Sequence, residues 1–170
     1  SGGTPREFCT ITVTDGIAMG HEGMKSSLIS REVIADSAEL TVRGHCYDAL
    51  VSIAACDKSL PGLMMSMLRL NVPSVFIYGG SILPGKFKGK DVTVVDVFEA
   101  VGKHSSGKMS SEELRELELV ACPSAGACGG QFTANTMACV SEAIGLALPY
   151  SAGTPAPYEE RDKYAFDSGQ

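Results

Sequence analysis

Several features that would place this sequence in a familiar class are missing. It has no tryptophan, and only 6% of its 170 residues are aromatic. No apolar run approaches the roughly 20 residues that a membrane-spanning helix needs, and residues 1–6 have neither the charge nor the apolar segment of a signal peptide. We therefore expect a soluble intracellular protein with no membrane partner, located in the cytoplasm or, in a eukaryote, in an organelle matrix.

Basic blocks and paired cysteine motifs are missing as well. The 14 Lys and Arg residues are scattered among 20 Asp and Glu, for a net charge of −6, so the chain offers nothing that attracts a phosphate backbone and no nucleic acid is expected. The six cysteines contain no C-x-x-C pair and follow no secretory signal. Reduced thiols are therefore expected, rather than a disulfide framework or a structural zinc site.

Strand and helix signals alternate along the sequence, which predicts an α/β fold. Runs rich in β-branched or apolar residues predict strands at 8–13, 49–54 and 74–78. Apolar residues at helical spacing predict helices at 30–43, 61–71 and 94–101, a further helix capped by Ser111, and a last one over about 137–148. Such an order favours a parallel sheet between helices, in three layers. Residues 1–150 then form one domain, and residues 151–170, which have no periodic pattern, a linker or truncated end.

Chemically active residues follow the expected strands. Asp15 comes after the first, Cys56-Asp57-Lys58 after the second, and Gly79-Gly80 after the third. The carboxyl ends of parallel strands meet at one edge of a sheet, where ligands bind. Carboxylates suit Mg²⁺, whereas thiolates suit iron–sulfur clusters or zinc, so this edge is predicted to hold a metal site.

Two more cysteines, Cys122 and Cys128, lie in a small-residue turn that leads into a helix. Because unpaired amides and the helix dipole favour a thiolate there, Cys128 is the best cluster ligand among the six. The three others, Cys9, Cys46 and Cys139, are interpreted as core residues.

The same residues also have plainer interpretations. Cys56 could be a small core residue, Asp15-Gly16 a turn, and Asp57-Lys58 a surface ion pair of little energetic value. The pair Gly129-Gly130 before a helix could bind phosphate, although a lone glycine pair is weak support.

Five segments, in this order, resemble the dihydroxy-acid dehydratase family: residues 14–24, 30–37, 56–62, 78–85 and 122–137. The resemblance covers almost the whole chain. It implies a lyase that removes water from 2,3-dihydroxy-3-methylbutanoate and its methylpentanoate homologue, giving 2-keto acids for valine and isoleucine biosynthesis. The implied cofactors are a 2Fe-2S cluster and Mg²⁺, and the substrate is a small dihydroxy acid.

Carried over by position, the resemblance implies that Cys56 and Cys128 bind the cluster. Asp15 and Asp57 would bind Mg²⁺, together with Lys58 as an N-carbamate. Carbamylation turns a cation into an oxygen ligand, which gives a chemical reason for a lysine beside two acids. The resemblance also offers Glu22 and Cys122 as candidates for a supporting shell, Cys122 with less support.

Family members are several-fold longer than this chain. They carry an upstream Cys as third cluster ligand, a later carboxylate on Mg²⁺, and a C-terminal domain with a Ser as general base. We therefore expect an N-terminal domain fragment, without the C-terminal domain, of an enzyme that is a homodimer and is active only at full length.

Two alternatives stay open at this point. A sugar-acid dehydratase of the 6-phosphogluconate type would share the cysteine and Mg²⁺ pattern. A non-catalytic α/β domain could instead bind phosphate through Gly79-Gly80 and Gly129-Gly130, although the sequence has no Walker or dinucleotide fingerprint.

Overall fold

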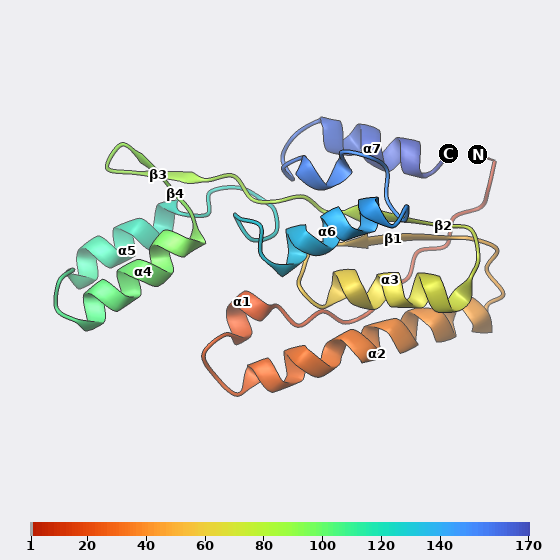
Figure 1. Cartoon of the computed structure of the whole chain (residues 1–170), viewed down its shortest axis with the longest axis horizontal. Coiled ribbons are helices and arrows are strands. Elements are labelled where there is room, and N and C mark those ends of the chain that lie inside the picture. The colour runs from red at the N-terminus through yellow and green to blue at the C-terminus, as the bar shows by residue number, and fades with distance from the viewer. Residues whose placement is uncertain (1) are drawn as a thin grey trace.

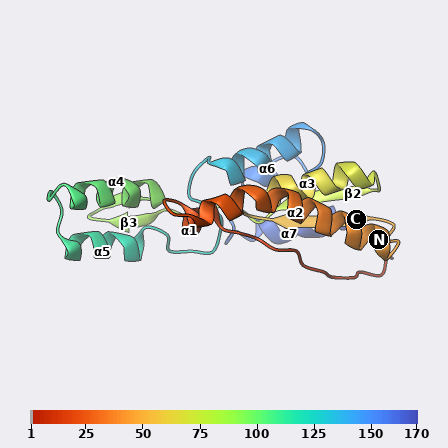
Figure 2. The same cartoon turned by 90° about the horizontal axis from the view of Figure 1, so that it is seen from below.

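A computed structural model describes residues 2–170, which form an α/β body and a smaller arm. The arm comprises residues 85–121, and all other described residues belong to the body. Figure 1 shows the arm projecting from one end of the body, and Figure 2 shows helix α1 on the side of the body nearest to it. Among these residues no helix is both long and apolar enough to cross a membrane.

The body is organised around a parallel strand pair. Strands β1 (Leu50–Ala54) and β2 (Ser74–Tyr78) pair in register, with Leu50 opposite Ser74 and Ala54 opposite Tyr78. On the other side of β2, an isolated bridge joins Phe76 to Ala147. The α/β class and both strand predictions, 49–54 and 74–78, are confirmed, although the parallel sheet has only two paired strands within residues 2–170.

Long helices bury the apolar side chains of the body. They are α2 (Gly23–Gly44), α3 (Ser59–Leu70) and α6 (Thr133–Ala143), and α2 packs along α3 beside the strands (Figure 1). The core includes Ile34, Val42, Leu60, Met64, Met67 and Phe76. Burial of this apolar surface is the main favourable contribution to folding of the body.

The predicted strand at 8–13 is wrong, because these residues are irregular. The segment contacts α2 and its end instead of the sheet: the hydroxyls of Thr10 and Ser37 lie 2.5 Å apart, and the Phe8 ring stacks on Tyr47 at 6.4 Å between centroids. A β-branched run becomes a strand only where a neighbouring strand is available to pair with it.

Several helix boundaries also differ from the predictions. Helix α2 begins at Gly23, ahead of the predicted residue 30, and α6 ends at Ala143, ahead of Pro149, where Gly145 takes a positive φ of 78°. Residues 151–170 contain the 3₁₀ turn η1 (Ser151–Gly153) and helix α7 (Glu160–Ser168), where no regular element was predicted.

A buried arginine explains why this last segment is ordered. Arg161 is 8% exposed and donates to the carbonyls of Tyr78 and Ser151, each at 2.5 Å, and of Thr154 at 3.0 Å. It thereby ties α7 to the end of β2. Contacts of this kind are tertiary, so no local pattern in the sequence predicts them.

The arm combines a hairpin with two helices. Strands β3 (Gly85–Phe87) and β4 (Lys90–Val92) are antiparallel and were not predicted. Helices α4 (Val94–Ser105) and α5 (Ser111–Val120) confirm the two helix predictions in this region, but the cap of α5 is Ser110 and not Ser111. The Ser110 hydroxyl accepts a hydrogen bond from the Glu113 amide at 3.1 Å, which satisfies one of the free donors at the helix start.

Candidate functional site

The turn between β1 and α3 carries Cys56, Asp57 and Lys58, all partly buried. Strand β1 ends at Ala54 and α3 begins at Ser59, so the three side chains lie at the carboxyl end of the parallel pair. The Ser59 hydroxyl closes the turn: it accepts from the Cys56 amide at 3.3 Å and donates to the Cys56 carbonyl at 3.0 Å. The predicted position of these residues at this edge is confirmed.

Asp15 reaches the same place from a distant part of the chain. It opens the short helix α1 (Asp15–Ala18) and is 7% exposed. One carboxylate oxygen, Oδ2, accepts from Lys58 Nζ at 2.6 Å, and the other, Oδ1, accepts from the hydroxyl of Ser27 on α2. Lys58 thus pairs with Asp15, and both side chains are largely buried, so the plainer interpretation of Asp57-Lys58 as a surface ion pair is wrong.

The two carboxylates of the cluster differ in proton affinity. Burial acts to raise the pKa of Asp15, but the hydrogen bonds from Lys58 and Ser27 and the Lys58 charge outweigh it and hold that pKa below its usual value. Burial, and then the negative charge of Asp15, raise the pKa of Asp57. One carboxylate is thus balanced by a cation, whereas the other lies in a negative environment that a bound cation would relieve.

Cys128 is brought to this edge by backbone pairing with the chain that follows β2. The Ala127 amide donates to the Gly80 carbonyl and the Ile82 amide donates to the Ala127 carbonyl, both at 2.8 Å. This close approach requires a glycine at 126, since a Cβ there would lie 2.4 Å from the Ile82 nitrogen, and its φ is +140°. The pairing fixes the loop that carries Cys128.

The expectation that Cys128 forms a thiolate easily is not met. Burial, and then the charges of Asp57 and Cys56, raise the pKa of the Cys128 thiol. Helix α6 begins only at Thr133, so Cys128 lies outside the first turn where the dipole acts. Cys128 follows Ala127, which pairs with the chain after β2, and Cys56 follows the neighbouring β1, so both thiols lie at the carboxyl end of the parallel pair.

The remaining candidates are more exposed. Cys9, Cys46 and Cys139 lie at the surface, so their interpretation as core residues is wrong, and no disulfide joins any cysteines of residues 2–170. Cys122 is also exposed, and Glu22 is exposed and paired with Lys25 at 2.6 Å.

The side chains at this edge are of the right chemical type to bind Mg²⁺ and an iron–sulfur cluster, but they are too few to complete either ligand set. Oxygen ligands from Asp15 and Asp57 suit Mg²⁺, and the thiols of Cys56 and Cys128 suit an iron–sulfur cluster. The Lys58 ammonium already places a positive charge against the Asp15 carboxylate, where a metal cation would otherwise bind. No group of three or more His, Cys, Asp or Glu side chains within residues 2–170 is arranged to hold a metal ion, so these residues supply a partial ligand set.

Of the two glycine pairs proposed for phosphate binding, Gly79-Gly80 is not available as an open loop. A Cβ on Gly80 would lie 2.5 Å from the backbone nitrogen of Ala156, and Gly80 is buried. The residue therefore serves close packing of the backbone, which removes one of the two supports for a phosphate-binding domain.

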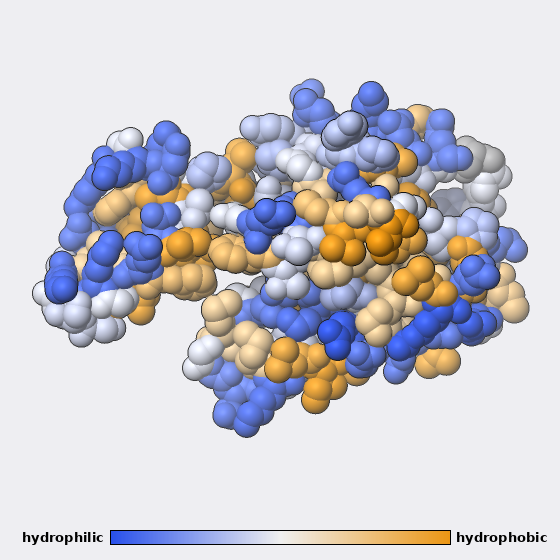
Figure 3. Space-filling model, viewed as in Figure 1, coloured by the Kyte–Doolittle hydropathy of each residue, from blue (hydrophilic) through white to orange (hydrophobic). Residues whose placement is uncertain are grey.

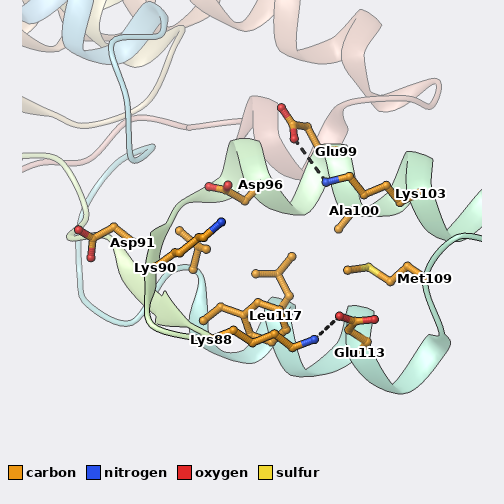
Figure 4. Close-up of a pocket in the computed structure, with 12 residues that line it drawn as sticks. Lys88, Lys90, Asp91, Asp96, Glu99, Ala100, Lys103, Met109, Glu113 and Leu117 are labelled. Atoms are coloured by element: carbon orange, nitrogen blue, oxygen red, sulfur yellow. Dashed lines mark hydrogen bonds and ion pairs between the residues drawn. The ribbon is translucent and has the colours of Figure 1, made fainter.

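A hollow of about 420 Å³ lies elsewhere, in the arm. Figure 4 shows two of its three lysines paired with acids along its rim: Lys103 with Glu99, and Lys88 with Glu113. Its charges are thus largely balanced, and it contains none of the candidate site residues.

Two residues near Asp15, one that contacts its carboxylate and one in the loop that follows α1, carried no sequence signal. Ser27 is fully buried and donates to Asp15, and His21 closes the loop between α1 and α2. A serine in a helix and a histidine in a glycine-containing loop have no spacing that marks them in advance.

Comparison with known proteins gives one consistent result. Residues 1–170 match the family described as dihydroxy-acid/6-phosphogluconate dehydratase, N-terminal. The chain is 91% identical over 170 residues to a dihydroxy-acid dehydratase of Pelagibacter ubique and 83% identical over 168 residues to one of Parvibaculum lavamentivorans. One of Metallosphaera sedula is 57% identical over 169 residues. These matches cover 99–100% of the chain, which spans only 29–30% of the length of the relatives.

Proposed function

The chain belongs to the dihydroxy-acid/6-phosphogluconate dehydratase family, and from this membership we propose that it forms part of a hydro-lyase acting on 2,3-dihydroxy-3-methyl carboxylates. The products would be the 2-keto acids of valine and isoleucine biosynthesis. The observation that supports this best is that Asp15, Asp57, Lys58 and two thiols lie at the carboxyl end of the parallel strand pair.

Elimination of water from such a substrate has two difficulties. The proton on C2 is weakly acidic, and hydroxide is a poor leaving group from C3. When bound, Mg²⁺ and a 2Fe-2S cluster would supply Lewis acidity, which stabilises charge on the enolate side and assists loss of the hydroxide. The residues of this chain would hold and orient these groups.

Asp15 and Asp57 would bind Mg²⁺ together with Lys58 as its N-carbamate. As an ammonium, Lys58 acts as the counter-ion of Asp15. Loss of a proton from the Lys58 ammonium gives the amine, whose nitrogen would form a bond to the carbon of CO₂ with release of a second proton. The resulting carbamate would replace the positive charge with a negative oxygen donor beside those of Asp15 and Asp57. The negative environment that raises the Asp57 pKa would be relieved by the divalent cation.

Cys56 and Cys128 would bind the cluster, with Cys122 and Glu22 in supporting positions. A cation or iron beside Cys128 would offset the charges that now raise the pKa of its thiol. The third thiolate, a further carboxylate on Mg²⁺ and a serine general base would come from other parts of the longer polypeptide. We propose a cytoplasmic, homodimeric enzyme that is active only at full length.

The branched-chain substrate is preferred over a sugar acid because the relatives described above are named dihydroxy-acid dehydratases. A phosphate-binding domain is not favoured, because the backbone of Ala156 covers Gly80.

The test is anaerobic reconstitution of the full-length protein with iron and sulfide, followed by visible absorption and by dehydration of 2,3-dihydroxyisovalerate with Mg²⁺. Cys56→Ser and Cys128→Ser should lose both the absorption and at least about 100-fold in turnover, because each removes a ligand. The exposed Cys46 provides the matched control, and Cys46→Ser should keep both.

Asp57→Asn should instead keep the absorption and lose Mg²⁺-dependent turnover, while Asp48→Asn, an exposed acid outside the cluster, should change neither. Turnover of 6-phosphogluconate without turnover of the branched-chain acid would overturn the substrate assignment. Unchanged turnover in Cys56→Ser and Cys128→Ser would overturn the ligand assignment.

A further inference from the structure

The imidazole of His21 bridges the end of α1 and the start of α2. Its Nδ1 accepts a hydrogen bond from the Gly23 amide at 3.0 Å, and its Nε2 lies 2.7 Å from the Ile17 carbonyl. A neutral imidazole has one N–H, so accepting at Nδ1 places the proton on Nε2, which then donates to Ile17. Both ring nitrogens are thus committed to backbone groups on either side of the loop.

Gly23 is shaped to receive this ring. A Cβ at position 23 would lie 2.6 Å from His21 Cε1 and 3.0 Å from Nδ1. Its φ is not positive, so a Cβ at this position would displace the imidazole and would not strain the backbone. His21 and Gly23 therefore form one steric unit.

The loop joins the two elements that hold the Asp15 carboxylate. Asp15 is the first residue of α1, and Ser27, which donates to its Oδ1, lies one turn into α2. Helix α1 has only four residues, too few to be stable by itself, so its position must come from contacts with its surroundings. The His21 bonds to Ile17 in α1 and to Gly23 in α2 are such contacts.

We propose that His21 is a positioning residue for the Mg²⁺ site. Its ring fixes α1 against α2, so that one oxygen of Asp15 stays on Ser27 and the other faces the cation position next to Lys58. This inference rests on the proposed function, in which Asp15 binds Mg²⁺.

The first test measures the Mg²⁺ dissociation constant of the full-length protein by calorimetry, independently of turnover. His21→Ala removes two hydrogen bonds of about 1 kcal/mol each and should weaken Mg²⁺ binding about tenfold. His21→Asn restores the acceptor for Gly23 and His21→Gln restores the donor for Ile17, so each should recover part of the affinity. His45→Ala, which removes an exposed imidazole bonded to the Thr41 carbonyl at 2.9 Å, is the control and should leave the affinity unchanged.

A double-mutant cycle tests the steric contact between His21 and Gly23 directly. Gly23→Ala should weaken Mg²⁺ binding by a similar factor, because the new Cβ displaces the ring. In the His21→Ala background the same substitution should have little further effect, since no ring remains to be displaced. Additive effects, or a fall in the melting temperature with no change in the dissociation constant, would mean that His21 is merely structural and would overturn the proposal.

Asp57→Asn distinguishes a failure of the proposed Mg²⁺ site from a failure of the role given to His21. If it leaves the dissociation constant unchanged, Mg²⁺ does not bind at this cluster, and the proposed function fails together with the inference drawn from it. If Asp57→Asn abolishes binding while His21→Ala does not weaken it, the proposed function stands and the role of His21 is refuted.

Discussion

The helices of the arm begin with side-chain caps, whereas those of the body that flank the site do not. Thr93 and Asp96 form a capping box at the start of α4, and Ser110 caps α5. Within the described residues 2–170, helices α2, α3 and α6 begin without a side-chain hydrogen bond at the cap position. The arm's helices are therefore specified locally, and those of the body by burial against one another.

The two regions also differ in how much apolar surface they bury. The arm's buried core consists of Val92, Ala100, Leu117 and Ala121 and borders the hollow of Figure 4. The core of the body is larger and runs through α2, α3 and both parallel strands. Figure 3 shows hydrophilic side chains over the outer end of the arm and apolar ones where it approaches the body.

The missing side-chain cap of α3 is related to the position of the candidate functional site. In α3 the cap position is taken by Lys58, whose side chain bonds to Asp15 and not to the helix start. The body can do without that local stabilisation because its larger core holds α3 in place. The Asp15–Lys58 ion pair thus uses a position that the helices of the arm use for capping.

The largest expected effect comes from removing one leucine from each core. Leu60 is 0% and Leu117 is 3% exposed, so Leu60→Ala and Leu117→Ala delete the same group from equally buried positions. Leu60→Ala should lower the free energy of unfolding by about 3–5 kcal/mol. Leu117→Ala should cost about 2–3 kcal/mol, because the adjoining hollow leaves the arm room to relax. Urea unfolding followed by circular dichroism measures both.

The Mg²⁺ affinity of the full-length protein provides a second comparison of the two leucine variants. The affinity should fall in Leu60→Ala, because α3 follows Lys58 directly, and stay unchanged in Leu117→Ala. Equal losses of stability and of Mg²⁺ affinity in both variants would show that the arm and the body are one cooperative unit.

Alkaline pH should weaken the body specifically, since all five tyrosines lie there. Burial raises the pKa of Tyr78 to about 12, against about 10 in an unfolded chain. Below pH 10 the phenol is protonated in both states. Between pH 10 and 12 the unfolded chain loses the proton first, so stability falls by about 2–3 kcal/mol.

Tyr78→Phe should remove this part of the alkaline loss and be nearly neutral at pH 7, because its buried hydroxyl has no hydrogen-bond partner among the described residues. Denaturant unfolding at pH 7, 10 and 11.5 measures the difference, with the exposed Tyr158→Phe as control. An equal alkaline loss in wild-type and Tyr78→Phe protein would contradict the assignment.

The sequence was most informative where a pattern is local. The two parallel strands and most helices follow from short apolar runs and helical spacing, and the site residues of the β1–α3 turn follow from strand order. Asp15 reached its predicted neighbours although the strand expected before it does not form, because Ser27 and Lys58 hold its carboxylate.

Long-range contacts explain what could not be predicted. Helix α7 depends on the buried Arg161, whose acceptor on β2, the Tyr78 carbonyl, lies 83 residues earlier in the sequence. The raised pKa of Cys128 depends on burial in the folded chain and then on the charge of Asp57, which is far away in the sequence. Neither a buried charge nor the charges around a thiol can be inferred from the residues next to them in the chain.

The smallest expected effect tests whether the arm depends on its caps. In α4 the Thr93 hydroxyl accepts from the Val95 amide at 3.3 Å, and the Asp96 carboxylate accepts from the Thr93 amide at 2.7 Å. Thr93→Ala should cost about 1 kcal/mol, seen as faster hydrogen exchange in α4 with β1 and β2 unaffected. Thr136→Ala, in the interior of α6 and exposed, is the control. If Thr93→Ala accelerated exchange equally in arm and body, local specification of the arm would be disproved, because its helices would then depend on the body core.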